Sequence, residues 1–328
     1  MVPPLITLEE HFLSEKADDV KKLYSEQLGN IPGVSEKLAD IGPIRLKSMD
    51  ETNIAIQVVS HGPGAMCVSQ CQAANDQLAA AVRAHPDRFA GFAVLPMADP
   101  DAAAKELTRC VRELPDFVGA LVDNRAGNGY YDGPAYDSLW RAAQDLDVPI
   151  YLHPTWATPE QTDLLYTGNF AEAATLSIGA SGWGWHSDVA LHVLRLFAAG
   201  TFDRFPRLKL IAGHMGEMLP FMLQRIVNLS PRWGPRERPF REVYDTNLWI
   251  TTSGVWSIDP MATILRNTKI ERILYSVDYP FGKNEDGLRF MQDLEQSGWL
   301  TPEQLERIAY KNSEDLLRLK VTTHKSRE

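Results

Sequence analysis

Short apolar runs and amphipathic stretches alternate along almost the whole chain. The apolar runs are rich in Val, Ile, Leu and Phe and are short, as strands buried on both faces should be. We predict strands over residues 5–9, 54–60, 88–95, 117–122, 149–153, 208–213, 247–252 and 272–277. Between and after them the polar pattern indicates helices over residues 68–84, 100–113, 134–146, 187–199, 216–229, 258–266, 284–295 and 302–317.

Eight strands with intervening helices predict an α/β protein with the (β/α)8 architecture of a TIM barrel. We expect a single domain over residues 1–328, because no internal repeat and no linker-like stretch divides the chain. The rival fold is a doubly wound open sheet. It is disfavoured because no glycine-rich phosphate loop follows an early strand.

Two connections are much longer than the others, over residues 12–50 and 154–186. We expect both to form excursions over the barrel mouth, since long loops in compact domains commonly serve as lids or subunit contacts. The second carries Trp156, Trp183 and Trp185. These rings indicate either an aromatic wall for a planar substrate or a subunit contact, and we favour a wall with an interface nearby.

Composition narrows the range of partners. The 328 residues are 44% apolar, which allows a large core, and the formal net charge of −10 argues against nucleic acid. No apolar run approaches the ~18 residues that cross a bilayer, and no secretory leader is visible. We interpret the three cysteines as reduced thiols and expect a cytoplasmic protein without a membrane partner.

Candidate metal ligands stand at the ends of predicted strands. Side chains alternate along a strand, so Glu9 and His11 share one face while Glu10 takes the other. His153 and Asp278 follow two later strands, and a barrel gathers such strand ends at one mouth. Buried together without a cation, these groups would be costly. Two carboxylates and two imidazoles therefore predict one divalent metal ion, zinc or manganese, with magnesium as a further option.

A second constellation follows the sixth strand. Glu217 lies three residues after His214, about one helical turn away, and could fix the imidazole tautomer for proton exchange. The alternative is that Glu217 only favours a helix N-terminus. Arg225, about two turns further on, suits either a substrate carboxylate or a surface ion pair. At the end of the second strand, we expect His61 to face the substrate. We assign no role to four other histidines: His85, His186, His192 and His324.

The order and spacing of these motifs resemble the amidohydrolase superfamily, in its branch of metal-dependent aromatic acid decarboxylases. That branch acts on γ-resorcylate, 2,3-dihydroxybenzoate, salicylate, orsellinate and 5-carboxyvanillate. The resemblance covers nearly the whole chain. The motifs that carry it are Leu8-Glu9-Glu10-His11-Phe12, Tyr151-Leu152-His153-Pro154, Phe202-Asp203-Arg204-Phe205-Pro206, Gly213-His214-Met215-Gly216-Glu217, Thr251-Thr252-Ser253-Gly254 and Ser276-Val277-Asp278-Tyr279-Pro280.

The resemblance implies roles for particular residues and a homodimer or homotetramer. Members of the classical amidohydrolases have His-x-His where this chain has Glu9-Glu10-His11, and many decarboxylases have Ala at the third position. The Glu-x-His form is similar to the γ-resorcylate type. The implied residues are the metal ligands Glu9, His11, His153 and Asp278, the catalytic pair His214 and Glu217, the carboxylate-binding Arg225 and the ring-lining Phe281.

We therefore expect a carboxy-lyase that removes carbon dioxide from an ortho-hydroxybenzoate without oxidation and, in reverse, carboxylates a phenol. Asp278 is the first choice for the proton donor, since it can serve as both ligand and acid. Hydrolysis of a lactone, ester or amide by a metal-bound water is the alternative. A barrel that binds a ligand without catalysis is a third hypothesis, but it predicts an incomplete set of strand-end polar residues.

Overall fold

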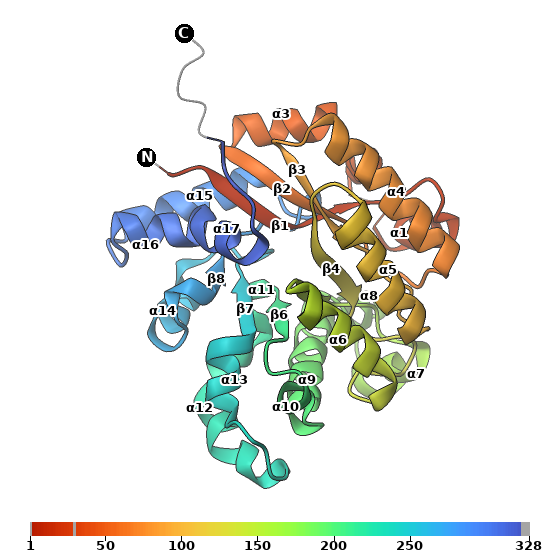
Figure 1. Ribbon diagram of the computed structural model, residues 1–328, viewed down its shortest axis with the longest axis vertical. Coiled ribbons are helices and arrows are strands. Elements are labelled where there is room, and N and C mark those ends of the chain that lie inside the picture. The colour runs from red at the N-terminus through yellow and green to blue at the C-terminus, as the bar shows by residue number, and fades with distance from the viewer. Residues whose placement is uncertain (1, 29–30, 323–328) are drawn as a thin grey trace.

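The fold is an eight-stranded parallel barrel surrounded by helices, seen in a computed structural model that describes residues 2–28 and 31–322 (Figure 1). Each strand pairs with the next one in the sequence, as in a TIM barrel. The predicted barrel is confirmed. The strands are β1 (Leu5–Phe12), β2 (Ile54–His61), β3 (Phe89–Ala93), β4 (Phe117–Asp123), β5 (Pro149–His153), β6 (Lys209–Ala212), β7 (Leu248–Thr251) and β8 (Ile273–Leu274).

The helices around the barrel occupy most of the predicted ranges. The α-helices are α1 (Asp18–Leu28), α2 (Val34–Ala39), α3 (Pro43–Glu51), α4 (Val68–Ala84), α5 (Pro100–Glu113), α6 (Asp137–Leu146), α7 (Pro159–Gln161), α8 (Glu172–Gly179), α9 (Gly184–Ala198), α10 (Thr201–Arg204), α11 (His214–Glu217), α12 (Leu219–Leu229), α13 (Phe240–Asn247), α14 (Ile258–Asn267), α15 (Asn284–Gln296), α16 (Pro302–Glu306) and α17 (Asn312–Leu317). Shorter 3-10 or π turns are η1 (Pro134–Tyr136), η2 (Thr162–Tyr166), η3 (Ser230–Trp233), η4 (Ile270–Arg272) and η5 (Arg307–Lys311).

The eighth strand is shorter than predicted because its continuation finds other hydrogen-bond partners. Tyr275 donates its N–H to Ile308 O (3.0 Å), and Ser276 donates to the Thr252 hydroxyl (3.1 Å). The ring then closes beyond β8, where His11 N donates to Tyr279 O at 2.7 Å. This closure places the segment that carries Asp278 directly beside β1.

Apolar side chains pack in two layers, one inside the barrel and one between the strands and the helices. The interior layer closes the end opposite the mouth with residues of α17, Leu316 and Leu317. Its strand residues are Ile6, Leu8, Ile56, Val58, Ala90, Phe92, Val118, Leu121, Tyr151, Ile211, Trp249 and Leu274. In the described part of the chain, no helix has both the length and the apolar character needed to cross a bilayer.

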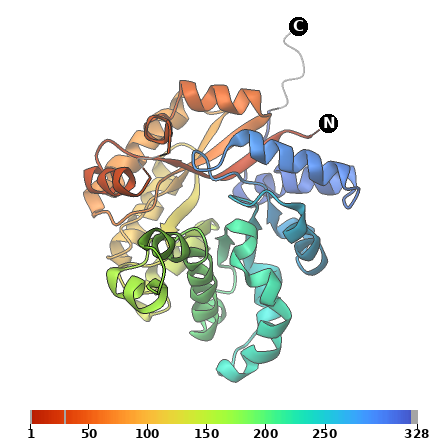
Figure 2. The ribbon, with the colours of Figure 1, turned by 180° about the vertical axis from the view of Figure 1, so that it is seen from behind.

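The two long connections cover the mouth, as predicted. Residues 12–50 contain α1, α2 and α3, and residues 154–186 contain α7, η2 and α8. Figure 2 shows α1 (red) and the green segment of residues 154–186 on the near side of the molecule. Both connections contribute aromatic side chains to one cavity, which gives the site its roof.

A buried histidine makes the stability of this fold depend on pH. His192, on α9, accepts a hydrogen bond from Tyr131 N at Nε2 (3.1 Å). Its Nδ1 therefore carries the proton and donates to Asn124 Oδ1 at 3.0 Å. Burial, with a smaller effect of Arg195, lowers the pKa of His192 to about 3. No local pattern in the sequence indicates these partners, and His192 is a structural residue of the core.

Acid should therefore weaken the fold through His192. An unfolded histidine has a pKa near ~6.5, so the stability from this neutral ring is present above that value and is lost as pH falls toward 3. Within this window the group should lower the free energy of unfolding by about 1.4 kcal/mol per pH unit. Denaturant titrations of wild type and His192→Gln should differ by that slope. Equal slopes in the two proteins would contradict the assignment.

Candidate active site and metal centre

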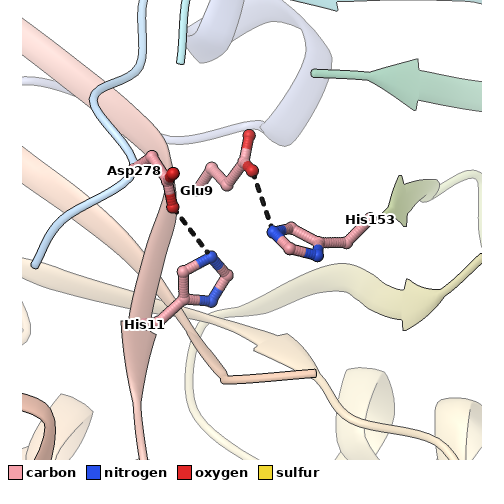
Figure 3. Close-up of side chains that lie close together, drawn as sticks. All are labelled: Glu9, His11, His153 and Asp278. Carbon is pink, nitrogen blue, oxygen red and sulfur yellow. Dashed lines mark ion pairs between the residues drawn. The ribbon is translucent and has the colours of Figure 1, made fainter. Parts of the chain in front are cut away.

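Four side chains from three parts of the barrel mouth point toward one central space (Figure 3). Glu9 and His11 come from β1, His153 ends β5, and Asp278 follows β8. Their ligand atoms all lie within 4.8 Å of one another. Glu9 Oε1 is 3.0 Å from His153 Nε2, and His11 Nε2 is 3.3 Å from Asp278 Oδ1. The structure thus brings together all four ligands expected from the sequence.

The donor set fits a divalent cation because its inner atoms have no other partner. Glu9 Oε1, His11 Nε2 and Asp278 Oδ1 are buried without a hydrogen bond. His153 Nδ1 donates to Pro154 O at 2.7 Å, so the Nε2 of a neutral ring turns its lone pair toward Glu9. Acceptors that face each other at such distances in a dry site require a positive charge between them. One divalent ion would supply it, and Glu9, His11, His153 and Asp278 are the residues that would hold the ion.

Surrounding groups hold the ligands in place. The Tyr151 hydroxyl hydrogen-bonds to Glu9 Oε2 and also lies 2.8 Å from Thr251 Oγ1. Ser60 Oγ lies 3.3 Å from His11 Nδ1. Such outer contacts orient metal ligands and fix imidazole tautomers. These contacts therefore fix the orientation of Glu9 Oε1 and His11 Nε2 toward the central space.

Charge at the site is distributed unevenly between the two carboxylates. The histidines His214, His153 and His11 outweigh the effect of burial and lower the pKa of Glu9 well below its ordinary value. For Asp278, burial and the neighbouring Glu9 charge raise the pKa to about 8. A bound divalent cation would favour the carboxylate form of Asp278 again. Asp278 is thus the group in which proton binding and cation binding compete.

Glu10 points away from these ligands, as predicted, but it has a structural role that the sequence did not reveal. Its carboxylate accepts backbone N–H groups of Val277 (3.2 Å) and Tyr279 (3.0 Å), the two neighbours of Asp278. Burial raises the pKa of Glu10 to about 8, although Arg45 opposes the shift. Adjacent residues of β1 therefore have different roles. Glu9 faces the proposed metal centre, and Glu10 fixes the segment that carries Asp278.

The His214–Glu217 pair is present, but not in the helix that was predicted over 216–229. Residues from His214 to Met218 all have positive φ, from 45° to 81°, and form a left-handed turn before α12 begins. Gly216 suits this turn, since an added Cβ would lie 2.8 Å from Ile250 Cγ2. The turn brings His214 Nδ1 to 2.7 Å from Glu217 Oε1. Pattern-based prediction assumed right-handed dihedral angles and so misplaced the helix start.

His214 faces the metal ligands with its other nitrogen, whose distance to Glu9 Oε1 is 3.5 Å. Burial alone would lower the pKa of His214, but the charges of Glu9 and Glu217 outweigh it and raise the pKa to about 10 when no cation is bound. A cation held by Glu9 would oppose this rise and favour the neutral ring. A further histidine, His186, lies on the far side of Glu217, with its Nδ1 2.7 Å from Glu217 Oε2. In the sequence, His186 is notable only for its position near Trp183 and Trp185, so its contact with Glu217 was not predicted.

Aromatic side chains enclose a cavity of about 170 Å³ above these polar groups. Phe281 and Tyr24 stack with ring centroids 5.9 Å apart, and Trp156 meets Trp185 edge to face at 5.4 Å. The predicted ring-lining position of Phe281 and the aromatic wall are therefore present, while Trp183 is 54% exposed. The cavity is lined by Tyr24, Leu28, Ile31, Pro63, His153, Pro154, Trp156, Ser181, Trp185, His214, Asp278 and Phe281.

Two predicted substrate residues lie outside this lining. Arg225 is exposed on α12, a helix that contributes none of the described lining residues. His61 is buried against Phe12, with ring centroids 5.3 Å apart, and its Nδ1 lies 2.7 Å from Gly62 O. Because α12 starts after the left-handed turn, spacing counted from Glu217 did not locate Arg225. Their roles in substrate binding stay predictions.

The fold and site define a TIM-barrel protein with a mononuclear metal centre at the carboxyl ends of its strands. The profile of the family described as Amidohydrolase matches residues 29–319. The chain belongs to this amidohydrolase family.

Relatives cover almost the full chain. It is 54% identical over 327 residues to the decarboxylase orsB of Emericella nidulans, covering 97% of this chain and 98% of that protein. It is 38% identical over 301 residues to a γ-resorcylate decarboxylase of a Rhizobium species, covering 84% and 88%. A Polaromonas dihydroxybenzoic acid decarboxylase, solved with manganese and the inhibitor 2-nitroresorcinol, is 32% identical with a TM-score of 0.84, covering 96% and 97%.

Proposed function

We propose that this protein is a metal-dependent carboxy-lyase that decarboxylates an ortho-hydroxybenzoate without oxidation and catalyses phenol carboxylation in reverse. One observation carries the proposal: the four-ligand centre and the His214–Glu217 pair share a small cavity walled by aromatic rings. A planar ring with adjacent carboxylate and hydroxyl oxygens matches that combination of apolar walls and a cation site.

Each part of the cavity has a task in this reaction. Phe281 and Tyr24 bind the ring and, with Trp156 and Trp185, exclude water from it. Glu9, His11, His153 and Asp278 would hold one divalent ion, which supplies a Lewis acid for the carboxylate and hydroxyl oxygens of the substrate. Orienting the ring in this way fixes the carbon that must receive a proton.

Asp278 is the proposed proton donor, since it lines the cavity and its carboxyl group can serve as both metal ligand and acid. It gives its proton to the ring carbon that bears the carboxylate. The bond to the carboxylate carbon then breaks, its electron pair restores the aromatic ring, and carbon dioxide leaves. Each turnover consumes one proton and changes no oxidation state of the enzyme. His214, oriented by Glu217, holds a substrate oxygen or returns the proton to the site.

Decarboxylation is favoured over the hydrolysis that we kept as an alternative. The relatives with 54%, 38% and 32% identity are all decarboxylases. Manganese in the Polaromonas relative supports manganese here, with zinc and magnesium as the other candidates. The non-catalytic hypothesis loses support because the strand-end set is complete.

A panel of hydroxybenzoates tests the function. Protein stripped with a chelator should regain activity with manganese, zinc or magnesium, and a γ-resorcylate, orsellinate and salicylate series should identify the substrate. Carbon dioxide release with loss of the substrate absorbance is the expected result. Incorporation of water from an ester or lactone, without carbon dioxide from any acid in the panel, would replace decarboxylation with hydrolysis.

We also propose a homodimer or homotetramer in the cytoplasm. Apolar side chains are exposed in the connection of residues 154–186, which covers the mouth, and this favours a subunit contact there. The free cysteines suit a reducing compartment. Changing Leu164 and Leu165 together to Asp should reduce the mass measured by light scattering, because these side chains are 81% and 61% exposed. A Trp299→Asp control, outside that segment, should keep the wild-type mass. An unchanged mass in the double variant would place the interface elsewhere.

A further inference from the structure

Glu217 is a fully buried carboxylate shared by two imidazole rings. Its Oε1 lies 2.7 Å from His214 Nδ1, and its Oε2 lies 2.7 Å from His186 Nδ1. The side chain of Glu217 has no exposed surface, whereas that of His186 is 20% exposed. The three residues therefore form a row from the rim of the mouth to the metal ligands, with the carboxylate in the middle.

The partners of His186 determine which atoms donate. Its Nε2 lies 3.0 Å from Ser181 O, and a backbone carbonyl can only accept. Its Nδ1 faces an oxygen of Glu217, and an ionised carboxylate also only accepts. An N–H at His186 Nδ1 satisfies the Glu217 oxygen that it faces. His214 then needs to supply only its Nδ1–H, which leaves Nε2 free toward the cavity.

We propose that His186 is a positioning residue of the active site, which acts through Glu217 to hold His214 in the Nδ1–H tautomer. The expected effect of His186 on catalysis rests on the proposed function, whereas its effect on the His214 tautomer does not. His186 and His214 are the hydrogen-bond donors to Glu217 among the described residues. Without His186, one oxygen of a buried carboxylate loses its donor, and Glu217 rotates or takes up a proton. Either change alters what His214 Nδ1 faces.

A second metal ion is the competing use of this cluster, since three such residues lie close enough together to ligate one. The satisfied hydrogen bonds argue against it. The first centre has unpartnered buried atoms on Glu9, His11 and Asp278, but no atom of His186, His214 or Glu217 is in that state in the described chain. An imidazole nitrogen that donates to a carboxylate at 2.7 Å has no lone pair to offer a metal.

Two variants distinguish the effect of the His186–Glu217 hydrogen bond from the effect of side-chain size at position 186. His186→Asn keeps an N–H donor near Nδ1, and His186→Leu removes it at a similar size. We expect His186→Leu to lose about 10–100-fold in kcat, the effect typical of an outer-shell partner, with KM and metal content retained. His186→Asn should keep most of the activity. His85→Asn, on a part-exposed histidine after α4, is the control and should match wild type.

The decisive measurement does not depend on activity. In zinc-loaded, 15N-histidine-labelled protein, the His214 ring should show the Nδ1–H tautomer in wild type and His186→Asn, and a mixture in His186→Leu. Unchanged His214 signals in His186→Leu would overturn the proposal, as would two metal ions per chain. Equal loss of kcat in both variants would overturn it as well. If wild type decarboxylates no hydroxybenzoate, the proposed function fails while the tautomer comparison still decides the role of His186.

Discussion

Asp278→Asn is expected to reduce decarboxylation by about 10²–10⁴-fold, the range that a positioned general acid contributes. The side chain lines the cavity, and its buried Oδ1 faces His11 Nε2 at 3.3 Å, so the amide occupies the same place. An amide cannot give up a proton to the ring carbon and return as a carboxylate. The loss should therefore appear mainly in kcat, measured from ultraviolet loss of the hydroxybenzoate.

A neighbouring aspartate supplies the matched control. Asp123 ends β4, pairs in register with His153 and accepts a hydrogen bond from Gly64 N, but it is outside the ligand set. Asp123→Asn should stay much closer to wild-type activity than Asp278→Asn. Metal content must be measured in both variants, because Asp278 is also a proposed ligand. Full activity in Asp278→Asn with metal bound would remove it from the mechanism.

Glu9→Gln is expected to empty the metal centre and abolish activity with it. Glu9 Oε1 lies 3.0 Å from His153 Nε2 and 3.5 Å from His214 Nε2, at the middle of the site. The substitution removes one of the two anionic charges that hold the cation. Loss of an outer-shell partner typically costs 10–100-fold in metal affinity, and loss of a ligand should cost more than about 100-fold. Metal analysis after dialysis measures this.

The control for this change is a buried glutamate outside the proposed ligand set. Glu106, on α5, is 2% exposed and is hydrogen-bonded to Asn75 and Arg109. Glu106→Gln makes the same chemical change, so it should keep the wild-type metal content even if it lowers stability. Retention of one ion per chain by Glu9→Gln would show that the other three ligands suffice.

The proposed metal ligands could be predicted from the sequence because, in a parallel barrel, the carboxyl ends of all strands lie at the same mouth. Glu9 and His153 are 144 positions apart, yet each follows an apolar run, and such ends meet at one mouth. Alternation of side chains along β1 likewise places Glu9 and Glu10 on opposite faces of the strand. These inferences needed only local patterns and one rule of topology.

Contacts that depend on packing were not accessible in this way. The first residues of the helix predicted over 216–229 belong instead to a left-handed turn. The backbone dihedral angles at His214 and Glu217 are set by tertiary contacts, which a local pattern does not contain. His186 looked unpartnered because the residue it binds, Glu217, is 31 positions away and has no fixed spacing from it. Arg225 is exposed on α12, and its role in binding the substrate carboxylate, which the family resemblance implies, stays a prediction.

Local sequence patterns were therefore enough to predict the barrel, its mouth and the four proposed metal ligands, because hydrophobic periodicity and strand ends are local features that the barrel topology converts into positions. The hydrogen-bond partners that hold the site residues in place became visible only in the folded molecule. Glu10 fixing the neighbours of Asp278, and Glu217 shared between His214 and His186, are pairings between distant residues. Their geometry is set by burial and hydrogen-bond satisfaction over the whole molecule, which no window of sequence contains.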